Sequence, residues 1–330
     1  MKNNLFCLIA LSFFTTKALC LLPTDISQII EGRKGYVVGE PYKEGRLGNQ
    51  MFHIASVLGY AWDHDFKPVF SGFDVTESNF KFNRDKVFFR LDFDTTDIEI
   101  DYFFIKLPTD ALYSPIPQYS NEYNVFLKGH FIGWKHFHHH YDNILKTFLP
   151  STEITNYLNE KYRDLLTEKN TVAVHVRTYS EKLHHLGFYF LGINFFKSAF
   201  ELFPQDSIFV IFSDRINWCK KKFTECFPNR NLVFVEGNSD IEDFFLMSTM
   251  HHQVLSYGST YSWWAAYLNH NPDSIIVHPK NGFWGLSDET YYLPNWHPID
   301  FIIEPYPEDM SSYDKETHDD IVYNNEIKRH

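Results

Sequence analysis

The second half of this chain alternates short, largely apolar runs with segments whose apolar residues recur at helical spacing. Short apolar strands separated by helices form a parallel sheet that helices cover on both faces, so we predict an α/β fold class. In such sheets ligands lie beyond the carboxyl ends of the strands. The predicted strands are 172–176, 208–212, 232–235, 253–256 and 274–278, and the predicted helices between them are 194–203, 218–223, 241–250 and 262–268.

The first half begins with a unit of the same type. Residues 36–38 predict a short strand, 40–48 a polar turn with glycines, and 49–62 a helix with an apolar face. Further along, 142–149 and 153–166 predict two more helices. The N-terminal half is therefore also expected to be mixed α/β.

A chain of 330 residues is expected to form about two domains, because a domain typically has roughly 150 residues. We expect an N-terminal α/β domain over 21–165, a C-terminal Rossmann-like domain over 166–304 and an acidic tail over 305–330. Residues 1–20 carry a lysine and then an apolar run about half as long as a bilayer span, which is typical of a signal peptide. An uncleaved anchor is the alternative. Membrane association is expected only through this segment, in the secretory pathway (a Golgi-type lumen or membrane) of a eukaryote, or after export from a bacterium.

The charge of the chain argues against one class of partner. Forty-two acidic residues against thirty Lys and Arg give a net charge of −12, which repels a phosphate backbone, so nucleic acid is not an expected partner.

The cysteines offer little scope for a disulfide. After signal removal only Cys219 and Cys226 are left. On one helix, seven residues would separate them by roughly 10 Å, too far for a disulfide unless the helix ends between them.

A glycine-bearing turn precedes the first predicted helix. Gly45, Gly48, Asn49 and Gln50 lie there, where backbone can approach a ligand and the free N–H groups of a helix start can meet an anion. A purely structural turn is the alternative. The pattern makes these four residues candidates for ligand binding.

Polar residues also follow two of the predicted strands. His175 and Arg177 fall on the same side of one strand end, where an arginine can form paired hydrogen bonds to a phosphate. Ser213 and Asp214 follow the next strand, where they could contact a ribose or cap a helix. Since parallel strands end at one edge of the sheet, all four are candidate site residues.

Hydroxyl side chains open the helix predicted near residue 262. Ser259, Thr260 and Ser262 bring hydroxyls and backbone N–H groups to one point, with the positive end of the helix dipole behind them. Core packing requires none of these hydroxyls. The tryptophan pair at 263–264 is instead expected in the core.

Taken in order, these segments resemble motifs of the α-1,2-fucosyltransferases of glycosyltransferase family eleven, with a likeness that covers 35–284. The motifs are Gly-x-Leu-Gly-Asn-Gln-Met from Gly45, His-x-Arg from His175, Phe-Ser-Asp-x-x-x-Trp-Cys from Phe212, and Asp-x-x-Leu-Met-Ser from Asp243 followed by Ser-Thr-Tyr-Ser-Trp-Trp-Ala-Ala-Tyr-Leu from Ser259. The resemblance implies a GT-B-type architecture, in which two Rossmann-like domains with parallel sheets face a cleft. It also implies GDP-fucose as donor, a galactose-terminated glycan as acceptor, inversion at the fucose anomeric carbon, and no metal or other cofactor.

The resemblance also implies roles for single residues. Arg177 would bind the β-phosphate of the donor and stabilise the charge that develops on the leaving GDP, with His175 in the same site. Asp243 would pair with the N1 and N2 hydrogens of guanine. Phosphate oxygens would be held by Ser259, Thr260 and the helix start at Ser262, while Gly45, Gly48, Asn49 and Gln50 would face the donor from the other domain.

One departure from the family pattern concerns charge. The family usually reads His-x-Arg-Arg-x-Asp, whereas residues 175–180 read His-Val-Arg-Thr-Tyr-Ser and lack the second arginine and the aspartate. Lys182 or Arg215 could supply the missing positive charge. A base for the acceptor hydroxyl is expected among Glu181, His184 and His185, of which we take His185 as the catalytic candidate.

The histidines of 136–140 have no carboxylate or cysteine partner nearby in the sequence, so we do not expect a metal site there.

The expected activity is transfer of fucose from GDP-fucose. The alternatives are a non-catalytic secreted relative that binds nucleotide sugars or glycans, and a transferase that uses another GDP-hexose.

Overall fold

The structure is a computed structural model that describes residues 35–41, 45–70, 85–91, 102–106, 113–121, 123–179, 187–281 and 286–310, with 102–106 described by backbone alone. The predicted signal peptide or anchor at 1–20, and the tail beyond residue 310, lie outside the described residues. Among the helices in the described part of the chain, none combines the length and the hydropathy that crossing a bilayer requires.

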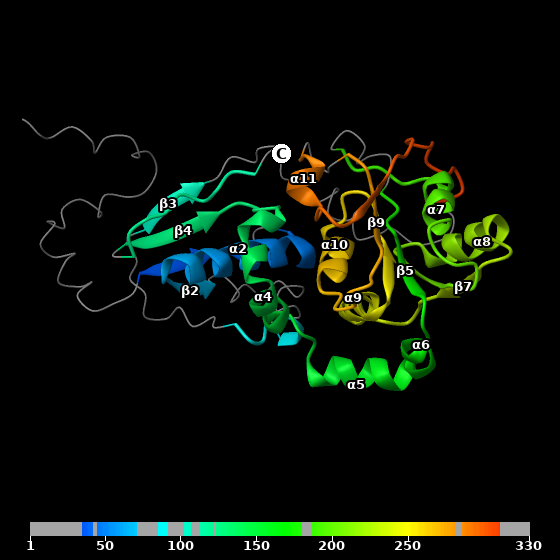
Figure 1. Cartoon of the computed structure of the whole chain (residues 1–330), viewed down its shortest axis with the longest axis horizontal. Coiled ribbons are helices and arrows are strands. Elements are labelled where there is room, and N and C mark those ends of the chain that lie inside the picture. The colour runs from blue at the N-terminus through cyan, green and yellow to red at the C-terminus, as the bar shows by residue number, and fades with distance from the viewer. Residues whose placement is uncertain are drawn as a thin grey trace, which may run out of the picture.

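Two parallel sheets form the centres of two lobes (Figure 1). The sheet of the first lobe has the strand order β2-β1-β4-β3, and the sheet of the second lobe has the order β10-β9-β8-β5-β6-β7. Every pairing within both sheets is parallel. The strands are β1 (Tyr36–Gly39), β2 (Lys67–Phe70), β3 (Tyr102–Lys106), β4 (Asn124–Lys128), β5 (Thr171–Val176), β6 (Ile208–Ser213), β7 (Asn231–Phe234), β8 (His252–Val254), β9 (Ile276–Pro279) and β10 (His297–Ile299).

Helices cover these sheets and connect the lobes. The described helices are α2 (Leu47–His64), η2 (Trp134–His136), η3 (His138–His140), α4 (Tyr141–Thr147), α5 (Thr152–Lys161), α6 (Arg163–Thr167), α7 (Ile193–Phe200), α8 (Ile216–Cys226), α9 (Asp240–Thr249), α10 (Thr260–Tyr267) and α11 (Asp288–Tyr291). In Figure 1, α5 and α6 carry the chain from the first lobe to the second. The α/β class is confirmed, and two parallel-sheet lobes match the GT-B-type organisation that the sequence implies.

Two local features differ from the sequence-based expectations, and a third agrees with them. The helix predicted over 153–166 breaks at Tyr162, whose backbone leaves helical geometry (φ −120°, ψ 22°) and separates α5 from α6. The edge strand β10 and the single-turn helix α11 were not predicted, because each is too short to show a periodic pattern. Cys219 and Cys226 both lie on α8 and form no disulfide, in agreement with the distance that seven helical residues impose.

The core continues from one lobe into the other through aromatic side chains. Phe52 of α2 packs against Trp263 of α10 with ring centroids 4.5 Å apart. Phe137, between η2 and η3, stacks on Trp264 at 5.3 Å. All four side chains are fully buried, which confirms that the tryptophan pair belongs to the core. Large aromatic surfaces buried between the lobes fix how α2 and α10 meet.

A glycine lets α2 and α10 approach closely at their first turns. A Cβ placed on Gly48 would lie 2.5 Å from the carbonyl carbon and 2.6 Å from Oγ1 of Thr260. Thr260 Oγ1 also donates a 2.8 Å hydrogen bond to Oδ1 of Asn49. The glycine expected to admit a ligand is therefore used to bring one helix against the other.

We expect Gly48→Ala to lower the melting temperature by a few degrees, because relieving the clash forces the two helix starts apart, at a cost of roughly 1–3 kcal/mol. Gly133→Ala is the matched control, since its added Cβ would meet nothing closer than 3.5 Å. Differential scanning calorimetry of both variants makes the comparison. A Gly48→Ala protein as stable as the parent would show that the close approach does not constrain the fold.

Candidate functional site

The arginine that follows β5 is fixed by an ion pair with the residue that follows β6. Arg177 Nη1 lies 2.9 Å from Asp214 Oδ2, and the side chains are only 13% and 14% exposed. The Arg177 guanidinium also lies 5.5 Å from the ring centre of Tyr179. These contacts hold the guanidinium beyond the carboxyl ends of two central strands, where parallel sheets bind ligands.

Asp214 also organises the loop after β5. Its Oδ1 accepts hydrogen bonds from the backbone N–H of Thr178 at 3.0 Å and from the Thr178 hydroxyl at 2.9 Å. Ser213 Oγ donates to Val176 O at 2.8 Å and accepts from Arg215 N at 3.0 Å. Both residues predicted to contact a ribose thus hold the strand ends together.

The carbonyl of His175 and the amide of Arg177 share one hydroxyl. Ser256 Oγ donates to His175 O at 2.5 Å and accepts from Arg177 N at 2.8 Å. The His175 imidazole is 7% exposed and lies 5.5 Å, centre to centre, from the Tyr261 ring. Burial, and then the charge of Arg177, lowers the pKa of His175 to about 3. His175 is therefore a neutral imidazole at physiological pH.

The helix starts of α2 and α10 face each other at the lobe junction. Ser259 is the N-cap of α10 and accepts from Ser262 N at 3.3 Å, while the Ser262 hydroxyl is fully buried and lies 3.3 Å from Ser259 O. Gln50 is buried and donates to Gly45 O at 2.8 Å. Side chains predicted to bind the donor thus lie at the two helix starts and stabilise them, and the dipoles of both helices present positive ends to one region.

Arg46 is the site residue that the sequence analysis missed, although it lies inside the first motif. It is the N-cap of α2, and solvent reaches its side chain. The pKa of Arg46 is nevertheless lowered to about 10. The larger cause is loss of hydration among the surrounding protein groups, and the second is the positive charge of Arg177. Tyr179, Asp214 and Asp240 act on the same guanidinium. Two arginines from different lobes thus repel each other in a region that solvent can enter.

Asp243 on the first turns of α9 is a half-buried carboxylate beside this region. Its Oδ1 accepts a 2.8 Å hydrogen bond from Asn238 Nδ2, and burial raises its pKa to about 6. The half-buried Tyr261 links the two segments, since its ring lies 5.4 Å from that of Phe244, the neighbour of Asp243, and 5.5 Å from that of His175. The carboxylate predicted to recognise guanine therefore belongs to the same region as the strand end that carries Arg177.

Comparison with known proteins decides the family. Residues 26–300 match the model of glycosyl transferase family 11. This chain belongs to glycosyltransferase family 11. It is 30% identical to an α-1,2-colitosyltransferase from Escherichia coli over 270 residues, which cover 72% of this chain and 90% of that protein. It is 26% identical to the mouse galactoside 2-α-L-fucosyltransferase Sec1 over 196 residues, 52% of either protein. The solved fucosyltransferase NodZ from Bradyrhizobium matches with a TM-score of 0.49 at 14% identity, over 71% of this chain and 92% of that one.

The residues that replace the usual family pattern have defined positions. Thr178 stands where the family has its second arginine, and it is 2% exposed with its hydroxyl on Asp214. Arg215 is 4% exposed and its Nη1 lies 3.4 Å from the carbonyl of Met310, so it extends toward the C-terminal segment. The other expected substitute, Lys182, and the predicted base His185 lie outside the described residues.

The histidines at 136–140 separate into three environments. His136 is enclosed, and burial lowers its pKa to about 4, while His138 Nδ1 lies 3.2 Å from the hydroxyl of Tyr267. His139 and His140 both contact the carboxylate of Asp63, at 2.9 and 2.8 Å. The sequence analysis was wrong to leave this cluster without a carboxylate, because its partner lies 76 residues away along the chain.

The Arg177–Asp214 pair predicts an energetic coupling that can be measured in this family 11 protein. Removing one member leaves a largely buried charge unpaired, so Arg177→Gln and Asp214→Asn should each cost about 2–3 kcal/mol in free energy of unfolding. In the double variant no charge is stranded, so the total cost should fall at least about 1 kcal/mol short of the sum.

Urea unfolding of the four proteins of this cycle is the measurement. The exposed pair Lys280–Asp300, at 3.1 Å, provides the control cycle, for which a coupling near zero is expected. Additive costs at Arg177 and Asp214 would contradict the ion-pair assignment.

Proposed function

We propose that this family 11 glycosyltransferase transfers fucose from GDP-fucose to a galactose-type hydroxyl of a glycan, with inversion at the fucose anomeric carbon. One observation carries the proposal: α2 and α10 meet at their first turns, with Arg46 of the first lobe at the N-cap of α2 and Arg177 of the second lobe bonded through its backbone N–H to Ser256, just before α10. Two guanidiniums and two positive helix ends together form a site for an anion with several charges. A diphosphate is such an anion.

The chemistry follows from where charge develops. As the acceptor oxygen attacks the anomeric carbon and the bond to the β-phosphate oxygen breaks, negative charge grows on the departing GDP. Arg177, fixed by Asp214 and Tyr179, is preorganised to stabilise this charge, and Arg46 supplies the second cation from the other lobe. Arg46 thereby does the work of the arginine that the family pattern has at the Thr178 position.

Base recognition is assigned to Asp243. An ionised carboxylate can accept both the N1 and the N2 hydrogen of guanine, whereas adenine and uracil offer no such adjacent pair. One relative is a galactoside 2-α-L-fucosyltransferase, which supports a galactose-type acceptor. Another is a colitosyltransferase, so the donor sugar has to be determined by experiment. A donor with a GDP-linked hexose other than fucose is therefore the second candidate. His185 stays our prediction for the base that takes the acceptor proton.

The function is tested by incubating the purified protein with GDP-fucose and a galactose-terminated oligosaccharide and measuring GDP release and the product linkage. Arg46→Ala and Arg177→Ala should each lower turnover about a hundredfold or more, because each removes a cation from the leaving group. Arg163→Ala, at an exposed position of α6, is the control and should leave turnover unchanged.

Circular dichroism would show that the Arg46→Ala protein is folded. If the protein transfers a sugar from another GDP-hexose and not from GDP-fucose, the proposed donor sugar is wrong and the proposed diphosphate site stands. No transfer from any GDP-hexose, with intact GDP binding, would favour the non-catalytic alternative.

GDP binding should depend on pH through Asp243. Guanine binds the ionised carboxylate, and the pKa of Asp243 in the free protein is about 6. Affinity is therefore expected to be constant above pH 7 and to fall by up to about tenfold per pH unit below pH 6, because binding must then release a proton. Calorimetry with GDP from pH 5 to 8 measures the profile.

Asp243→Asn is the control for that profile, because it keeps the ionisation of the GDP phosphate and removes the carboxylate. The variant should bind GDP weakly and lose the added pH dependence. Equal affinity of the parent protein for GDP, ADP and UDP would remove Asp243 from base recognition.

Transfer is proposed to need no metal ion, since the cations at the junction are protein groups. We expect turnover to persist in excess EDTA and to be unchanged by added Mg²⁺ or Mn²⁺. Metal-dependent transfer would instead use clustered carboxylates to hold the ion on the diphosphate. Loss of turnover in EDTA that Mn²⁺ restores would show that a metal carries the charge here assigned to Arg46 and Arg177.

A further inference from the structure

A group of side chains that could bind a metal ion lies at the opposite end of α2 from Arg46. It consists of Asp63, His139 and His140, whose ligand atoms all lie within 4.8 Å of one another. His139 Nε2 is 2.9 Å from each carboxylate oxygen of Asp63, and His140 Nε2 is 2.8 Å from Oδ1. Within the described residues no other group of three His, Cys, Asp or Glu side chains meets this spacing.

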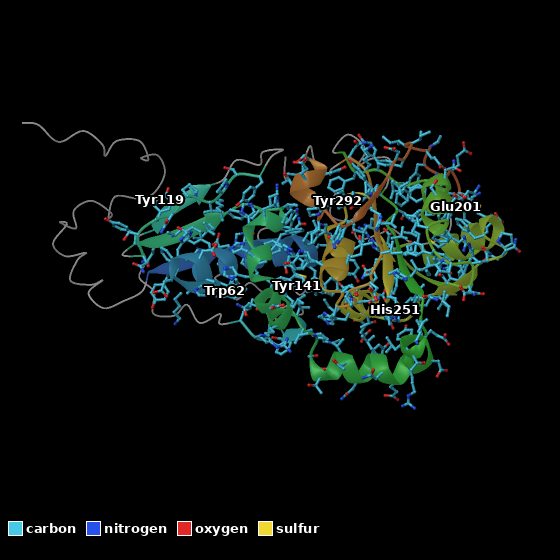
Figure 2. All side chains as sticks on the ribbon, in the orientation of Figure 1. Trp62, Tyr119, Tyr141, Glu201, His251 and Tyr292 are labelled. Carbon is cyan, nitrogen blue, oxygen red and sulfur yellow. The ribbon has the colours of Figure 1, made fainter. Side chains whose placement is uncertain are left out.

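The surrounding contacts hold these side chains in place. The His140 ring packs edge-on against Trp62 at 5.1 Å between centroids. Gly59 lets the backbone of 136–140 lie directly on α2, since an added Cβ would be 2.6 Å from His136 O. Figure 2 shows Trp62 and Tyr141, the chain neighbours of Asp63 and His140, on the first lobe. The three groups are therefore brought together by packing that does not depend on their own contacts.

The ligand set suits a borderline transition metal. Two imidazole nitrogens and one carboxylate oxygen are common ligands of Zn²⁺, whereas Mg²⁺ and Ca²⁺ prefer oxygen ligands alone. In a tetrahedral zinc site the ligand atoms stand about 3.3 Å apart, so opening the present 2.8–2.9 Å contacts by a few tenths of an ångström makes room for the ion. Asp63 and His139 are exposed, so water can complete the coordination.

We propose that Asp63, His139 and His140 bind one divalent transition metal ion of the zinc type, which joins the end of α2 to the segment at 136–140. The site does not take part in sugar transfer, because Asp63 lies seventeen positions beyond Arg46, which is about 25 Å along the helix. Its role is structural. The segment it anchors carries Phe137, whose ring stacks on Trp264 of the second lobe.

Binding is tested on tag-free protein stripped with chelator, by calorimetry with ZnCl₂ and by thermal unfolding with and without one equivalent of Zn²⁺. One equivalent should bind and raise the melting temperature, while MgCl₂ should have no effect. Asp63→Asn and His140→Ala should each weaken Zn²⁺ binding at least about tenfold. His270→Ala, an exposed histidine elsewhere, is the matched control and should bind like the parent.

Two further readouts make the test decisive. Asp63→Asn keeps the shape of the side chain, so an unchanged melting temperature of the metal-free variant shows that lost binding is not lost folding. Transfer activity should be the same with and without Zn²⁺, so the metal site and the proposed function can fail separately. A hydrogen-bonded cluster only, with Zn²⁺ binding that is absent or the same in Asp63→Asn as in the parent, would overturn the proposal.

Discussion

The close contact between the first turns of α2 and α10 determines the geometry of the whole molecule. Gly48 has no side chain where Thr260 lies, so the two helix starts can touch, and the aromatic packing of Phe52 on Trp263 holds them there. The consequence is electrostatic. Two positive helix ends, with Arg46 at the cap of one and Arg177 beside the other lobe's central strands, share one solvent-accessible junction.

Arg46 and Arg177 bring two positive charges to one junction. Burial, and then the charge of Arg177, lowers the pKa of Arg46, so the neighbouring arginine disfavours its charged form. The carboxylate of Asp214 forms an ion pair with Arg177 and accepts a hydrogen bond from the backbone N–H of Thr178. Repulsion of this kind, maintained by packing elsewhere in the fold, is what makes a site ready to bind a diphosphate and to stabilise it further as a leaving group.

The sequence predicted what depends on local pattern. The strands and helices after residue 171 were found because their apolar periodicity is carried by neighbouring residues, and Arg177 was found because a strand end directs it. Arg46 was missed because its importance comes from Arg177, which lies in the other lobe. Asp63 was missed for the same reason, being separated from His139 by 76 residues. Ser213 and Ser262 stay predicted ligand-binding hydroxyls, and the structure adds internal hydrogen bonds of both hydroxyls that the sequence did not predict, because the same residue types also close strand ends and helix starts.

In the proposed site, each lobe contributes one arginine to the binding of a single diphosphate. A crystal structure of the protein with GDP tests it most directly, because the distances from each guanidinium to the phosphate oxygens can be read from it. We predict that Arg46 and Arg177 both donate hydrogen bonds to the diphosphate of GDP. A complex in which the diphosphate contacts residues of one lobe only, with Arg46 directed away from it, would contradict the account.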